Sequence, residues 1–169
     1  MSFRDHVITI PSFQTQNTIR DYISSAPFDT APSDQWHVTV NVLTSPIDES
    51  LLNKQARYQA VPKTAQLWHD DATGRLSLVV VLESEDLAAR HRDLTSKHGS
   101  KYETYVPHMT LVYGFPSLTR SNKAFVASLA GSMNRIGTSE APLTFEGEYL
   151  IDSNGYAPNA EGQKYYAGF

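Results

Sequence analysis

Residues 36–43 have the sequence WHVTVNVL and residues 106–114 have the sequence VPHMTLVYG, and these two stretches decide the fold. Both alternate as β-strands do, and both contain His-x-Thr. Successive side chains of a strand point to opposite faces, so residues i and i+2 share a face. His37 therefore points the same way as Thr39, while Val38 faces the opposite side and can pack against helices.

The second strand repeats this arrangement with His108 and Thr110 on one face and Met109 on the other. Two such strands lying side by side would direct two imidazoles and two hydroxyls into one cleft. We expect this cleft to be the active site, with four catalytic residues: His37, Thr39, His108 and Thr110.

Each strand ends a β-α-β unit of matching length. The first unit is predicted as a strand over 6–10, a helix over 14–25 and the strand over 36–43. The second is predicted as a strand over 75–83, a helix over 84–98 that Ser84 caps, and the strand over 106–114. Thirty residues separate Val7 from His37 and 29 separate Val79 from His108, so each unit places its histidine at the same point.

The remaining segments fit around this duplication. Residues 64–70 and 75–83 are predicted to form a hairpin over the turn 71–74, with a third helix at 121–133 and a further strand at 143–152. We therefore predict one α+β domain over 1–152, built from two pseudo-symmetric β-α-β lobes with antiparallel sheets around a central cleft. The tail 153–169 is expected to be partly ordered.

Two histidines with two threonines suit the cleavage of a phosphodiester. One imidazole can act as general base, and the other, protonated, can donate to the leaving oxygen. Imidazole is the side chain whose ordinary pKa allows both forms near neutral pH. Threonine hydroxyls can donate to phosphate oxygens and stabilise charge that develops in the transition state. This chemistry requires no metal and no cofactor.

Six further residues are candidates for substrate binding. Aromatic faces stack on any nucleobase, and acidic or phenolic groups on the last strand could reach base edges or ribose hydroxyls. Core packing is as good an interpretation for the aromatic residues near the motifs, and an exposed charge is the simpler interpretation for the acidic ones. The candidates are Trp36, Tyr113, Phe115, Glu146, Glu148 and Tyr149.

Composition narrows the class of partner. A net charge of −4 argues against duplex DNA, which normally requires a basic excess, and favours a small cyclic or short RNA-like nucleotide held by local groups. No apolar run is long enough to span a membrane, and the first 13 residues do not have the pattern of a signal peptide. With no cysteine in the chain, a cytoplasmic setting is the simplest expectation, and the sequence leaves the oligomeric state open.

The motifs His37-Val38-Thr39-Val40 and His108-Met109-Thr110-Leu111 resemble the 2H phosphoesterase superfamily, as does the approach Tyr105-Val106-Pro107. The resemblance implies a bilobal fold, metal-independent chemistry, and RNA-type or cyclic phosphodiester substrates. The short separation of the motifs is similar to that of compact phage members, some of which degrade the cyclic oligonucleotide signals of the CBASS immune system in the host cytoplasm. The chain lacks the Arg-x-Phe-x-Ala opening strand of the bacterial RNA-ligase-like branch.

Three alternatives remain open on the sequence. The same cleft could bind a cyclic nucleotide without cleaving it, as a sponge or sensor, or it could process RNA as a 2′,3′-cyclic or 2′-5′ phosphodiesterase. A metal-dependent hydrolase is disfavoured because neither His69-Asp70-Asp71 nor the pair His91 and Asp93 has compact ligand spacing. His6 and His98 have no partner pattern in the sequence.

Overall fold

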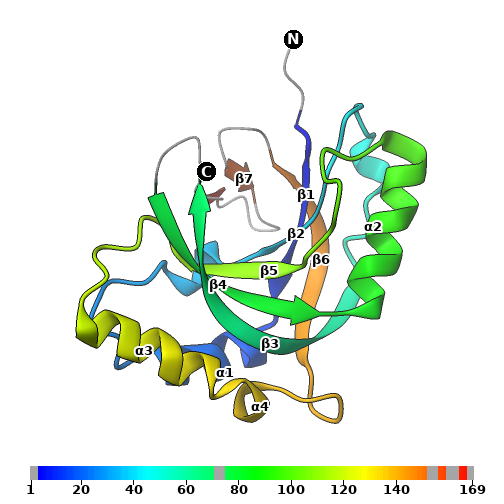
Figure 1. Cartoon of the computed structure of the whole chain (residues 1–169). Coiled ribbons are helices and arrows are strands. Elements are labelled where there is room, and N and C mark those ends of the chain that lie inside the picture. The colour runs from blue at the N-terminus through cyan, green and yellow to red at the C-terminus, as the bar shows by residue number, and fades with distance from the viewer. Residues whose placement is uncertain (1–3, 71–74, 152–155, 159–163, 167–169) are drawn as a thin grey trace.

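The computed structural model describes residues 4–70, 75–151, 156–158 and 164–166. Figure 1 traces the elements in chain order. The helices are α1 (Phe13–Ile23), α2 (Glu85–His98), α3 (Arg120–Ala130) and α4 (Met133–Ile136), with short 3-10 turns η1 (Ser33–Gln35) and η2 (Glu49–Leu51). The strands are β1 (His6–Pro11), β2 (Val38–Val42), β3 (Arg57–Asp70), β4 (Arg75–Glu83), β5 (His108–Val112), β6 (Leu143–Ile151), β7 (Tyr156–Pro158) and β8 (Lys164–Tyr166).

Six strands form one closed antiparallel barrel in the order β1-β2-β5-β4-β3-β6. The predicted α+β class is confirmed. β2 and β5, the strands of the two motifs, are neighbours in the barrel. β7 and β8 pair as a separate two-stranded sheet. The predictions for the turn 71–74 and for most of the tail 153–169 lie outside the described residues.

The two predicted β-α-β units are present as β1-α1-β2 and β4-α2-β5. Ser12 and Ser84 begin the two helices by accepting hydrogen bonds from the backbone N–H groups of Thr15 and Leu87, which satisfies donors that the first turn leaves unpaired. The third helix differs from its prediction. It begins one residue earlier, at Arg120, because Thr119 caps it, and it ends at Ala130, before a second short helix.

The strand β3 is longer than predicted, because it begins at Arg57 rather than at residue 64. Pro62 lies within it, beside a shift in the register with β4 between Pro62 and Thr64. A proline cannot donate to the ladder, so it is tolerated where the pairing is irregular. The early start allows β3 to pair with β6 as well as with β4, which closes the barrel.

The core lies on the outer face of the barrel, between strands and helices. Figure 1 shows α2 along one side of the strands and α1, α3 and α4 grouped at another. Side chains of alternate strand positions, such as Val38, Val80 and Met109, pack there with helix residues such as Leu87 and Leu129. The other alternate positions therefore face the inside of the barrel. No helix in the described part of the chain is long and apolar enough to cross a membrane.

Candidate active site

The barrel brings both His-x-Thr pairs together on its inner face. β2 and β5 are antiparallel neighbours, with Val38 opposite Met109. Continued by one residue in each direction, this antiparallel register sets His37, just before β2, opposite Thr110 and Thr39 opposite His108. Side chains directly opposite one another on adjacent strands have Cβ atoms about 5 Å apart. The four predicted catalytic side chains thus form one square in which each histidine lies across from the threonine of the other motif.

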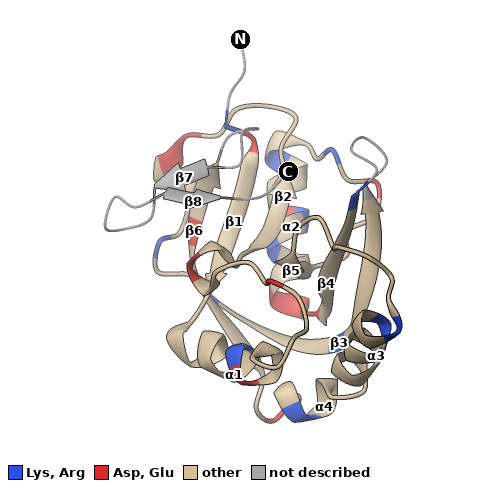
Figure 2. Ribbon diagram, turned by 90° about the vertical axis from the view of Figure 1, so that its left-hand side faces the viewer, with Lys and Arg blue, Asp and Glu red and all other residues tan. Residues whose placement is uncertain are grey.

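The strands β1, β2 and β5, which surround this square, contain no acidic or basic side chains other than histidine. His37 is 5% exposed and Thr39 7% exposed, whereas His108 and Thr110 are partly buried. Figure 2 shows that β1, β2 and β5 carry no lysine, arginine, aspartate or glutamate, while charged residues lie on β3, β4 and β6, on helices and on connecting segments. Hydrogen-bonding groups, rather than fixed charges from these three strands, would therefore contact a ligand here.

Both histidines are oriented in the same way. The Nδ1 atom of His37 lies 3.1 Å from the carbonyl oxygen of Gln35, and Nδ1 of His108 lies 2.9 Å from that of Val106. A carbonyl oxygen can only accept, so each Nδ1 carries the proton that it donates. The basic lone pair of each neutral ring is then on Nε2, which is the atom that would exchange a proton with a substrate.

Burial keeps both rings neutral. It lowers the pKa of His37 from 6.5 to about 4, opposed by the hydrogen bond to Gln35 and reinforced by the charges of His108 and His6. Burial also lowers the pKa of His108, against the hydrogen bond to Val106. Both pKa values fall for the same reason: a charged imidazolium is poorly solvated when it is buried, so burial favours the neutral ring.

A β-bulge follows the threonine of each motif. In β2 the partners of Ile8 and Val7 are Thr39 and Asn41, so Val40 is the extra residue. In β5 the partners of Val79 and Leu78 are Thr110 and Val112, so Leu111 is the extra residue. Bulges re-aim neighbouring side chains and recur beside active sites. β2 and β5 therefore each carry a bulge directly after the threonine of their motif.

Trp68 belongs to the site although sequence reasoning missed it. Its ring centroid lies 4.4 Å from that of His108, at an interplanar angle of 51°, and its Nε1 donates to Oε1 of Gln66 over 2.8 Å. Gln66 lies opposite Val79, which in turn lies opposite Thr110. The sequence signal that could have identified Trp68 was the alternation of residues 64–70, followed across the hairpin from β3 to β4 and on to β5.

His6 was also missed. It occupies the same face of β1 as Ile8, whose partner is Thr39. Its Nδ1 lies 2.6 Å from Oδ1 of the buried Asp5, which Lys101 contacts from the other oxygen at 2.7 Å. His6 therefore has a partner, Asp5, that no pattern in the sequence indicated. A positive charge on His6 would lower the pKa of His37 further.

The aromatic candidates near the motifs divide into core and surface. Trp36 is 2% exposed and donates from Nε1 to the carbonyl oxygen of Ala31 over 3.0 Å. Phe115 is buried in an edge-to-face contact with Phe28, with centroids 4.8 Å apart. The prediction that these two rings stack on a base is wrong, because both rings are buried in the core. Tyr113 is partly buried just beyond the end of β5.

Two candidates of the last strand reach the inner face. Tyr149 packs with Ile8 and Ile151, apart from the main core. Glu146 lies opposite Ile10, is exposed, and is 3.9 Å from Arg57. Both positions are compatible with contact to a ligand.

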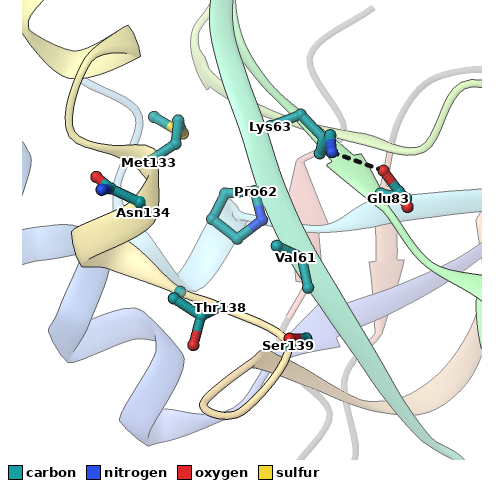
Figure 3. A pocket seen from close by; sticks show the side chains of 9 residues that line it. Val61, Pro62, Lys63, Glu83, Met133, Asn134, Thr138 and Ser139 are labelled. Atoms are coloured by element: carbon teal, nitrogen blue, oxygen red, sulfur yellow. Dashed lines mark ion pairs between the residues drawn. The ribbon is translucent and has the colours of Figure 1, made fainter.

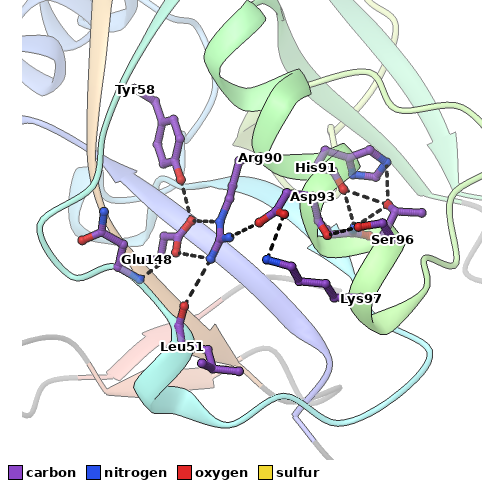
Figure 4. Close-up of polar contacts among 11 residues, drawn as sticks. Leu51, Tyr58, Arg90, His91, Asp93, Ser96, Lys97 and Glu148 are labelled. Atoms are coloured by element: carbon purple, nitrogen blue, oxygen red, sulfur yellow. Dashed lines mark hydrogen bonds and ion pairs between the residues drawn. The ribbon is translucent and has the colours of Figure 1, made fainter.

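The third candidate of that strand, Glu148, is fully buried in the network of Figure 4. Its carboxylate accepts two hydrogen bonds from Arg90, at 2.7 and 2.9 Å, one from the Tyr58 hydroxyl, and one from the backbone of Asn53. The carboxylate raises the pKa of Arg90, and burial followed by the carboxylate raises that of Tyr58. The prediction that Glu148 contacts substrate is wrong, because these partners use its oxygens to join β6 to α2 and β3.

The pocket drawn in Figure 3 lies elsewhere. It measures about 440 Å³ between β3, the end of β4 and the segment after α4. Its lining includes Pro62, Lys63, Glu83 and Met133 but none of the four motif residues. Among the residues described, no group of three or more His, Asp or Glu side chains is placed to hold a metal ion.

Comparison with known families adds a second observation. The model of the family described as Anti-CBASS protein Acb1 matches residues 11–131, well over half of the chain. The chain belongs to the Acb1 family. The matched span contains both His-x-Thr motifs and ends before β6. Membership of the Acb1 family associates the chain with phage counter-defence against cyclic oligonucleotide signalling. No curated protein matches the sequence.

Proposed function

We propose that this protein is a metal-independent phosphodiesterase that hydrolyses cyclic oligonucleotide signals by His/His acid-base catalysis. The single observation that supports it most is the register of β2 and β5, which sets the histidine of each motif opposite the threonine of the other. Family membership supports the choice of a cyclic oligonucleotide over other phosphodiesters.

His37 suits the general base and His108 the general acid. Burial disfavours the charged imidazolium, and His37 is the more buried ring, so its Nε2 is available to take a proton. His108 is closer to solvent and can be protonated when an anionic phosphodiester lies beside it, because a neighbouring negative charge favours the imidazolium.

The reaction then balances as a hydrolysis. His37 removes a proton from water as its oxygen forms a bond to phosphorus, and the bond from phosphorus to the leaving ribose oxygen breaks. His108 gives that oxygen a proton. The sum is one water consumed and one ring opened to a linear oligonucleotide. If a ribose 2′-hydroxyl attacks instead, the same two transfers give a cyclic phosphate end. Thr39 and Thr110 donate to the non-bridging oxygens in either case.

The aromatic rings of the inner face suit the bases of such a substrate. Trp68 flanks His108, and Tyr149 lies in the row that runs through Ile8 and Thr39. Stacking on aromatic rings tolerates any base, whereas Glu146 could accept hydrogen bonds from exocyclic amines.

We also infer that the barrel consists of two pseudo-symmetric lobes of the 2H type. Exchanging β1 with β4, β2 with β5 and β6 with β3 leaves the pairing order unchanged, which supports this view. The bulges at Val40 and Leu111, and the two matching Nδ1 hydrogen bonds, support it further.

The test is a panel of cyclic di- and trinucleotides, 2′-5′ oligoadenylate and nucleoside 2′,3′-cyclic phosphates, incubated with purified protein and analysed by mass spectrometry. We expect a linear product from at least one cyclic oligonucleotide. Stoichiometric binding with no product would overturn the enzymatic proposal in favour of a sponge. Equal cleavage of ribose and 2′-deoxyribose substrates would identify water as the nucleophile.

A further inference from the structure

Side chains of the second unit hold the strand segment that carries Thr39. The Tyr105 hydroxyl donates to the carbonyl oxygen of Thr39 over 2.9 Å. Nδ1 of His91, on α2, lies 2.9 Å from the carbonyl oxygen of Val40 and donates to it. Two consecutive carbonyl groups around the first bulge are thus bound by Tyr105 and His91, which we call the clamp.

The two side chains of the clamp pack against each other. The rings of His91 and Tyr105 are stacked with centroids 4.1 Å apart and planes 4° from parallel. Tyr102 lies against both, with centroids 6.1 Å away in each case. The backbone carbonyl of His91 accepts from Nδ2 of Asn41, so α2 also binds the residue after the bulge.

The local geometry explains why a clamp is needed. β5 begins at His108, and β2 pairs with β5 at Val38 and Met109, close to that beginning. Val40, which follows Thr39, bulges out of the ladder with β1. A buried carbonyl without a donor is costly, and a bulge without support can change its direction. The clamp meets both needs.

The second unit solves the same problem differently. There the carbonyl of the bulged residue, Leu111, accepts from the backbone N–H of Ala31 over 2.7 Å. No side chain is required for that bond. The first unit therefore depends on two side chains that lie in neither motif, and these side chains act on Thr39 rather than on Thr110.

We propose that Tyr105 and His91 are positioning residues that fix the aim of the Thr39 hydroxyl at the phosphate. The inference rests on the proposed function, because it assigns a task to Thr39 in that reaction. The clamp contacts the backbone of β2 and not the substrate, so it should affect the chemical step more than the binding step.

The test begins with Tyr105→Phe, which removes one hydroxyl and keeps the ring stack. We expect kcat to fall roughly 10-fold while KM changes by less than about 2-fold, since slight misplacement of a catalytic group lowers turnover strongly. Tyr22→Phe, at a partly buried tyrosine of α1, is the matched control and should leave both constants unchanged.

Double-mutant cycles then separate positioning from general destabilisation. Tyr105→Phe should have little further effect on kcat in a Thr39→Val background, because the hydroxyl it positions is gone. It should retain its full effect in a Thr110→Val background. His91→Leu should behave like Tyr105→Phe, whereas His91→Asn, which keeps a donor near the same place, should recover most of the turnover.

The outcomes distinguish the two proposals. If the unmodified protein cleaves nothing in the nucleotide panel, the proposed function fails. If it cleaves and Tyr105→Phe couples equally to both threonines, or leaves kcat unchanged, the positioning role of the clamp is refuted while the proposed function stands.

Discussion

The two His-x-Thr units share a motif and a backbone but differ in their surroundings. His37 is almost fully buried and its strand is held by the clamp, whereas His108 is partly exposed and carries Trp68 against its ring. Two imidazoles in unequal surroundings differ in how readily each is protonated. The difference supports the proposal that two similar units supply the imidazoles, and that unequal burial and neighbours assign them unequal tasks.

The largest expected effect comes from removing either histidine. His37→Ala and His108→Ala should each lower turnover by about 100-fold or more, because each removes one partner of acid-base catalysis. EDTA should have no effect in the unmodified protein. A substrate whose leaving oxygen is replaced by sulfur distinguishes the general acid from the general base, because a thiolate leaves without a proton donor. That substrate should restore much of the rate to His108→Ala and little to His37→Ala.

Rescue of His37→Ala instead would reverse the assignment of base and acid. Robust activity in either variant on the natural substrate, or its loss with a chelator, would contradict the mechanism. His98→Ala, in the last turn of α2, is the control for loss of an imidazole elsewhere.

The next effect concerns stability and pH. The pKa of His37 is lowered to about 4 in the folded protein, while the unfolded chain has an ordinary value near 6.5. Below pH 6.5 the unfolded state therefore binds the proton first, and stability falls as the pH drops toward 4, by roughly 3 kcal/mol in all. Urea unfolding of the unmodified protein and of His37→Gln, from pH 7 to pH 4, should show this loss only when His37 is present.

His108→Gln provides the comparison between the units. The pKa of His108 is lowered in the same direction, but the ring is less buried. We expect its removal to flatten the pH dependence of stability less than His37→Gln does. Equal slopes in all three proteins would mean that burial of these rings does not control their protonation.

The smallest effect is expected at Trp68, which belongs to one unit only. Stacking of a base on an aromatic ring contributes about 1–3 kcal/mol, so Trp68→Ala should raise KM about 10-fold or more. Trp68→Phe keeps a ring and should keep most of the affinity. Trp36→Phe is the control in the core, and substrate binding should not change. A purely catalytic defect in Trp68→Ala, with KM unchanged, would show that the ring orients His108 rather than binding a base.

Sequence alone predicted the elements whose signals are local. Alternation located β2 and β5, the Ser84 cap located the start of α2, and equal spacing indicated two repeated units. It did not predict the break between α3 and α4 or the early start of β3. A helix ends, and a strand extends, partly according to what it packs against, which the local sequence does not contain.

For the site, the sequence determined which chemical groups are available and that each His shares a face with its Thr, because strand periodicity is a local property. Only the tertiary structure decided that β2 and β5 are neighbours in a register that sets each His opposite the other Thr. It also decided that Trp68 joins them, while Trp36, Phe115 and Glu148 are committed to the interior. Burial and cross-strand contact depend on residues far apart in the chain, so aromatic and acidic side chains near a motif cannot be sorted into core and site until the barrel closes.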